Sequence, residues 1–141
     1  MANFFREVET SPEEILKELK SACQDLVYIS EIDSEVTPFR GPMAEEVSPE
    51  LISEFFAARM AEGVEQITLE AFFERLTAEK DWHAERNKQA VAGYKKLYQI
   101  IKENLTHATV LKFGRVQKQI FVVGIDAEGY LAGVTAKAVE T

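Results

Sequence analysis

The 141-residue sequence predicts an α/β fold, a three-layer α/β/α sandwich around a mixed sheet. Helical and strand-like stretches alternate over the first two thirds of the chain, and three consecutive strands follow. The segment 120–123, Ile-Phe-Val-Val, has no polar alternation, which is typical of a central strand buried on both faces. Helices should then cover both sides of the sheet. With 46% hydrophobic residues the chain can bury such a core, and we expect one domain over 1–141, with 1–10 as a flexible N-terminal extension.

The first helix and strand are marked by capping and periodicity. Ser11, Pro12 and Glu14 form a capping box, and an apolar stripe at helical spacing follows through Cys23. Because this cysteine lies on the stripe, we expect a core thiol and not a reactive one. The β-favouring run 26–29 predicts a buried strand.

Three further helices are expected in the middle of the chain. Ser48-Pro49 repeats the start signal, and the helix that follows should end at Gly63. A brief strand over 64–67 precedes Thr68, which can cap a short helix. The longest helix covers about 84–104, and Gly93 inside it indicates close packing, since glycine weakens a helix by about 1 kcal/mol relative to alanine.

The last third predicts an antiparallel meander of strands over 108–113, 116–125 and 130–140. Gly114-Arg115 favours a two-residue type II′ hairpin. Asp126 and Gly129 occupy the first and last positions of an expected type I turn.

The net charge of −8 is concentrated in the first half of the chain. Residues 1–80 carry 18 acidic and 7 basic side chains, whereas residues 81–141 carry 6 and 9. Between 31 and 50 a single base, Arg40, faces six acids, and prolines and a glycine interrupt the same stretch, so we expect an exposed acidic loop. The acids are Glu31, Asp33, Glu35, Glu45, Glu46 and Glu50. The loop is either a solvated connection or a surface for a basic partner, and the charge argues against direct nucleic-acid binding.

Composition also limits the location and the chemistry. The chain shows no secretory signal and no long apolar run, and its only cysteine excludes an internal disulfide, so we expect a cytoplasmic protein without a membrane segment. No nucleophile elbow, phosphate loop, dinucleotide fingerprint or zinc-protease motif occurs. His83 and His107 are isolated from other ligand-type residues, so a metal or catalytic role is unsupported and we expect no enzyme.

The C-terminal half carries a resemblance to a known family. Asp81-Trp82, the helix around Lys96-Leu97 and above all the ending 130–141, Tyr-Leu-Ala-Gly-Val-Thr-Ala-Lys-Ala-Val-Glu-Thr, resemble the nuclease A inhibitor family of bacterial proteins. The likeness extends over 12–33 and 67–141 and is poor over about 36–64.

The resemblance implies an inhibitor that plugs the active site of a sugar-nonspecific, magnesium-dependent endonuclease of the ββα-metal type. Two positions follow from the family: the C-terminal Thr141, which would approach the partner's hydrated Mg²⁺, and Glu31 after the first strand. We add Asp33, Glu35 and Glu140 as candidate nuclease contacts, with no cofactor or metal of the chain's own. The partner would be a secreted or periplasmic nuclease, and the free inhibitor would be a monomer.

Other interpretations remain open. Thr141 could simply end the last strand, and Glu31 could be an ordinary solvated acid. The poorly matching segment 36–64 motivates an alternative function, an acidic interaction module of the same fold with a different basic partner or a small-molecule ligand.

Overall fold

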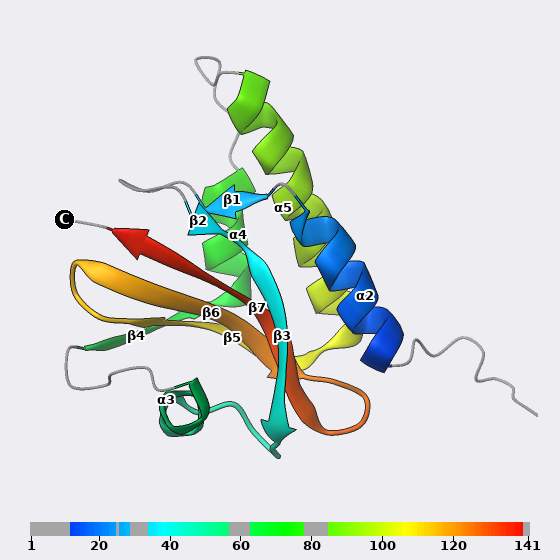
Figure 1. Ribbon diagram of the computed structural model, residues 1–141, viewed down its shortest axis with the longest axis vertical. Coiled ribbons are helices and arrows are strands. Elements are labelled where there is room, and N and C mark those ends of the chain that lie inside the picture. The colour runs from blue at the N-terminus through cyan, green and yellow to red at the C-terminus, as the bar shows by residue number, and fades with distance from the viewer. Residues whose placement is uncertain (1–11, 25, 29–33, 57–62, 78–84, 140–141) are drawn as a thin grey trace, which may run out of the picture.

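The computed structural model describes residues 12–24, 26–28, 34–56, 63–77 and 85–139 (Figure 1). The helices in this part of the chain are α2 (Pro12–Cys23), α3 (Pro49–Phe56), α4 (Leu69–Thr77) and α5 (Glu85–Asn104). The strands are β1 (Val27–Tyr28), β2 (Ser34–Glu35), β3 (Thr37–Met43), β4 (Val64–Thr68), β5 (Thr106–Phe113), β6 (Gln117–Ile125) and β7 (Tyr130–Val139).

The main sheet has five strands in the order β3-β7-β6-β5-β4, and every neighbouring pair is antiparallel. The expectation of a mixed sheet is therefore wrong. The strand expected over 26–29 does not enter this sheet, because β1 pairs only with β2 in a separate antiparallel ladder. Burial of a strand on both faces requires helices on both sides, and it does not require a parallel neighbour.

The apolar run in β6 lies at the centre of the sheet, as the sequence predicts. Ile120 and Val122 belong to the core under α2, α4 and α5, whereas Phe121 and Val123 belong to a second cluster on the opposite face. That second cluster is covered by α3 through Ile52, which is fully buried. Helices thus lie on both faces of the sheet, with α3 alone on one side among the described helices (Figure 1).

Several local predictions are confirmed. The Ser48 and Thr68 hydroxyls accept hydrogen bonds from the amides three residues on, at 3.2 and 3.1 Å. A β-carbon at Gly93 would lie 2.9 Å from Leu26 Cδ1, which is the close packing expected there. Cys23 is buried, and burial raises the pKa of its thiol to about 11, as expected for a core thiol.

The expected acidic loop contains a strand that the sequence reasoning missed. Residues 37–43 form β3, an edge strand in spite of Pro38 and Pro42, because an edge strand needs ladder hydrogen bonds on one side only. Arg40, the single base of the stretch, fixes this strand: its Nε and Nη2 donate to Asp126 at 2.9 Å and Glu128 at 3.1 Å. These bonds connect β3 to the turn between β6 and β7.

The two turns of the meander differ in outcome. Gly129 N–H donates to Asp126 C=O at 3.0 Å, as the expected four-residue turn requires. The two-residue hairpin at Gly114-Arg115 is wrong, since pairing of β5 with β6 stops at Phe113 and Gln119. The β5-β6 connection is therefore longer, and the Gly114 amide donates to Gly63 C=O beside β4.

Candidate functional site

The small β1-β2 ladder lies beside the C-terminal end of β7 (Figure 1). Val27 pairs with Glu35 and Tyr28 with Ser34. The backbone amide of Lys137 donates a 3.1 Å hydrogen bond to Ser34 Oγ, which links β2 to the last residues of β7. The described residues on both sides of segment 29–33 are thus joined to the strand that leads to residue 140.

Buried apolar residues hold the ladder in place. Tyr28 is 7% exposed and stacks on Phe72 of α4 with ring centroids 6.1 Å apart. Val36, directly after β2, is buried in the same core, and its amide donates to Leu26 C=O at 3.2 Å. From there the chain enters β3, which pairs Thr37 with Thr135 of β7. Buried residues therefore hold the chain both before and after segment 29–33, Tyr28 on one side and Val36 on the other.

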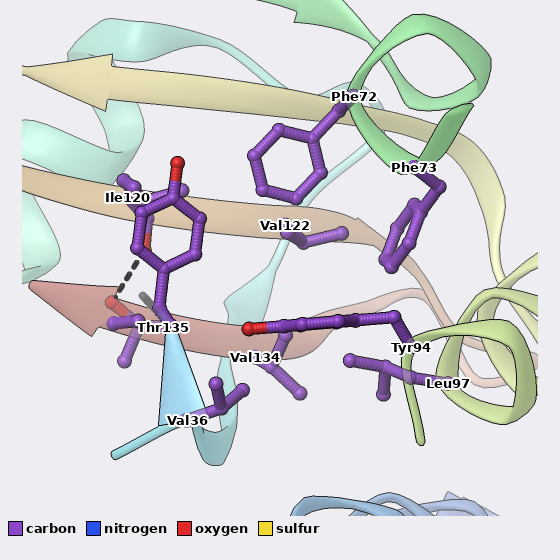
Figure 2. A pocket seen from close by; sticks show the side chains of 11 residues that line it. Val36, Phe72, Phe73, Tyr94, Leu97, Ile120, Val122, Val134 and Thr135 are labelled. Carbon is purple, nitrogen blue, oxygen red and sulfur yellow. Dashed lines mark hydrogen bonds between the residues drawn. The ribbon is translucent and has the colours of Figure 1, made fainter. Parts of the chain in front are cut away.

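A small apolar cavity lies under this ladder, between the sheet, α4 and α5 (Figure 2). Its walls include Tyr28, Tyr94, Phe72 and Val134, and the Thr135 hydroxyl at its edge donates to Ile120 C=O at 2.7 Å. The volume is about 20 Å³, which is room for about one water molecule. A cavity of this size does not hold an organic ligand.

Of the five predicted contact residues, only Glu35 is among those that the structure describes. Glu35 is exposed on β2, directly after Ser34, which bonds to Lys137. Glu31, Asp33, Glu140 and Thr141 lie outside the described residues. The remaining acids of the predicted acidic stretch, Glu45, Glu46 and Glu50, are exposed, as predicted, but they lie around the start of α3.

The β7 end of the sheet also carries basic residues that sequence reasoning did not connect with the site. Lys118 lies opposite Ala138 in the ladder, and the exposed Lys137 lies opposite Gln119. Lys112 is buried, with its Nζ 6.0 Å from the centre of the Phe72 ring. At this end of the sheet, β2 of the acidic first half of the chain therefore lies beside lysines of the basic second half. The role of Ser34 also could not be predicted from the sequence, because a strand of two residues leaves no recognisable pattern.

No metal centre is visible in the described ranges, where no three His, Cys, Asp or Glu side chains gather closely enough to hold an ion. His107 is exposed and adopts a positive φ of 55° at an irregularity in the β5-β6 pairing. His83 lies outside the described residues. The described helices include none that is long and apolar enough to span a membrane.

Strand ends and charged side chains converge at this surface, beside a cavity too small for an organic ligand. The chain belongs to the family of nuclease A inhibitor-like proteins, whose model matches residues 13–141. The matched range includes 36–64, where the sequence resemblance is weak. A search of curated proteins finds no match. Membership of the family indicates an inhibitor of a nuclease, and hence a protein partner, and not an enzyme.

Proposed function

We propose that the protein binds a sugar-nonspecific, Mg²⁺-dependent endonuclease of the ββα-metal type and blocks its active site with the β1-β2 end of the molecule. The observation that carries the proposal is the Ser34–Lys137 hydrogen bond, which joins β2 to the end of β7. Segment 29–33, with Glu31, and the residues after Val139, with Thr141, both continue from this joined region. In this proposal the two contact elements that the family resemblance implies act together on the nuclease.

The chemistry of a nuclease active site suits these residues. Mg²⁺ prefers oxygen ligands and keeps several waters, so the oxygens of Thr141 could approach the partner's ion directly or through water. Cationic side chains that hold phosphate in the nuclease would face the carboxylates of Glu31, Asp33, Glu35 and Glu140. In this proposal the Mg²⁺ belongs to the nuclease, and the inhibitor supplies no cofactor.

The biological setting follows from the same proposal. A cytoplasmic inhibitor would protect the producing cell from its own nuclease before that enzyme is secreted or reaches the periplasm. The free inhibitor would be a monomer and would form a 1:1 complex. An interface of standard size would bury about 1,600 Å² in total, and added salt would slow association.

The decisive experiment is titration of a purified ββα-metal nuclease with the protein and with two C-terminal variants, one lacking Thr141 and one with a tag after it. We expect both changes to abolish or greatly weaken inhibition, because the oxygens of the last residue are removed or buried in added chain. A tag at the N-terminus is the matched control and should leave inhibition unchanged. Full inhibition by the deletion variant would rule out the C-terminal mechanism.

A second variant tests the loop. Glu31→Ala should raise the dissociation rate of the complex if its carboxylate is buried against a cation of the nuclease. The exposed Glu70→Ala on α4 is the control, since it should leave that rate unchanged. An unchanged rate for Glu31→Ala would remove that residue from the contact.

Of the alternative functions, a small-molecule ligand gains no support from the cavity under β1, which is too small for one. A different basic partner has a specific observation in its favour, the exposed Glu45, Glu46 and Glu50 around the start of α3.

A further inference from the structure

The connection between β5 and β6 lies at the same end of the sheet as the last described residues of β7 (Figure 1). In the ladder of β6 with β7, Gln117 pairs with Val139. Paired residues of neighbouring antiparallel strands have Cα atoms about 5 Å apart. Arg115 and Val116 directly precede Gln117, and we call these two residues the β5-β6 tip. The tip is therefore close to Val139, where the described part of β7 ends.

The backbone of this connection is fixed. Gly114 has φ +106°, and a β-carbon there would lie 2.2 Å from the Gln117 carbonyl oxygen, so the position requires glycine. The Gly114 amide donates to the Gly63 carbonyl at 2.9 Å, which attaches the connection to the residue before β4. A pre-organised surface loses less conformational entropy on binding than a flexible loop does. The tip is therefore suited to contact with a partner.

The side chains of the tip have no described role in the fold. Val116 is 47% exposed and belongs to neither hydrophobic cluster of the described residues. Arg115 is exposed and forms no ion pair with the described part of the chain. A single exposed valine is ordinary on a protein surface, but a valine and an arginine on a fixed turn offer an apolar contact and a bidentate donor together. Such an arginine fits a carboxylate of a partner.

The proposed nuclease contact at the end of β7 needs more surface than this strand end supplies. An interface of standard size covers about 800 Å² on each partner, or about 20–30 residues. On one side of β7, Ser34 of β2 bonds to Lys137, and on the other side β7 pairs with β6. A nuclease that covers the end of β7 therefore extends over neighbours on both sides. On the β6 side the exposed neighbour is the β5-β6 tip.

We infer that the β5-β6 tip contacts the nuclease beside its active-site cleft, on a surface that is acidic. The inference rests on the proposed function, because it requires the end of β7 to face the enzyme. A cleft that holds phosphate is cationic and would repel the Arg115 guanidinium, so the tip lies outside the cleft. There Arg115 forms a bidentate ion pair with a carboxylate of the nuclease, and Val116 packs on apolar atoms next to it. The inhibitor then presents acids to the cleft and a base beside it, which fixes one orientation of the complex.

The test measures inhibition and dissociation rates with a purified ββα-metal nuclease that the unmodified protein inhibits. Arg115→Glu should raise the dissociation rate about tenfold or more, Arg115→Met by less, and Val116→Ser about threefold. None of these variants should shift the thermal midpoint, because both side chains are exposed. If the facing surface of the nuclease were cationic, Arg115→Glu would bind more tightly, and that result would overturn the proposal.

Two variants are matched controls. Lys17→Glu makes the same change of net charge at an exposed residue of α2, which lies on the right in Figure 1, whereas the end of β7 lies on the left. Met43→Ser removes a side chain that is 65% exposed at the opposite end of β7, where Met43 pairs with Tyr130. Both controls should change the dissociation rate less than about twofold.

The outcomes separate this inference from the proposed function. Inhibition by the unmodified protein with unchanged rates for the tip variants, or with equal losses in the controls, would overturn the tip contact and leave the proposed function standing. Failure of the unmodified protein to inhibit any ββα-metal nuclease would instead refute the proposed function, and the tip contact with it.

Discussion

Replacement of Asp126 should be among the most destabilising single changes outside the apolar core. Its side chain is 1% exposed, and its Oδ2 accepts from Arg40 Nε at 2.9 Å. Its Oδ1 accepts from the backbone amides of Glu128 at 2.9 Å and Tyr130 at 3.0 Å. One carboxylate thus forms the turn between β6 and β7 and also fixes β3, whose Arg40 lies over the Tyr130 ring at 4.2 Å.

The contacts give a ranking of three variants. Asp126→Ala leaves a partly buried guanidinium and two amides without their acceptor, a loss of about 3–5 kcal/mol in the free energy of unfolding. Asp126→Asn keeps an oxygen for the turn amides but directs an NH₂ group at Arg40, so we expect about 1.5–3 kcal/mol. Glu128→Gln removes only the outer ion pair, whose carboxylate is 59% exposed, and should cost about 0.5 kcal/mol or less.

Urea unfolding followed by circular dichroism at pH 7 and constant salt measures the three values. Similar m-values would show that the unfolded state is unchanged. If Asp126→Ala cost no more than Glu128→Gln, the buried carboxylate would not be the link that holds the edge strand.

Three further predictions test other parts of the molecule. Gly133→Ala should lower the free energy of unfolding by about 3 kcal/mol or more, because the backbone has φ +156° and the new β-carbon would lie 1.9 Å from Val122 O. Gly41→Ala is the control: no neighbour would lie closer than 3.5 Å to its β-carbon, so stability should change by about 1 kcal/mol or less. Equal losses in thermal or urea unfolding would contradict the packing. Burial raises the pKa of Cys23 from 9.0 to about 11, so the native state keeps the thiol proton after the unfolded state has lost it, and stability should fall as pH rises from 9 to 11. Cys23→Ala should remove this part of the fall. An unchanged dependence of stability on pH in that variant would refute the assignment to Cys23. Ser34→Ala should speed hydrogen exchange at the Lys137 amide about threefold to tenfold while Ser34→Thr restores it, and an unaltered exchange rate would show that the bond does not connect the ladder to β7.

Most of the element order could be predicted because its signals are local. Helix starts at Ser48 and Thr68 depend on the side chain and the next turn, and the apolar run in β6 reports its own burial. The strand β3 could not be predicted in the same way. Its prolines and glycine favour a loop, and long-range contacts fix it as an edge strand, namely the ladder with β7 and the bonds of Arg40 to Asp126 and Glu128. The antiparallel pairing of β3 with β7 is likewise set by tertiary contacts.

The candidate site was less accessible to sequence reasoning than the fold. The acidic character of Glu35 is visible in the sequence, but its position beside β7 depends on Ser34, a residue without any motif around it. The lysines at the same end come from β5, β6 and β7, and pairing register alone brings Lys112 and Lys118 to the strand ends near Lys137. Glu31 and Thr141 remain predictions of the family resemblance.

The position of β7 has a consequence for the order in which the molecule forms. This strand is the last in sequence of those that the structure describes, yet it lies inside the sheet, between β6 and β3. During synthesis β3 has no strand partner until β7 emerges from the ribosome and pairs with it. Proteolytic cleavage within 130–139 would return β3 to that unpaired state. Completion of the sheet and attachment of β2 to β7 therefore depend on the same strand, and under the proposed function an unfinished or clipped chain would not inhibit.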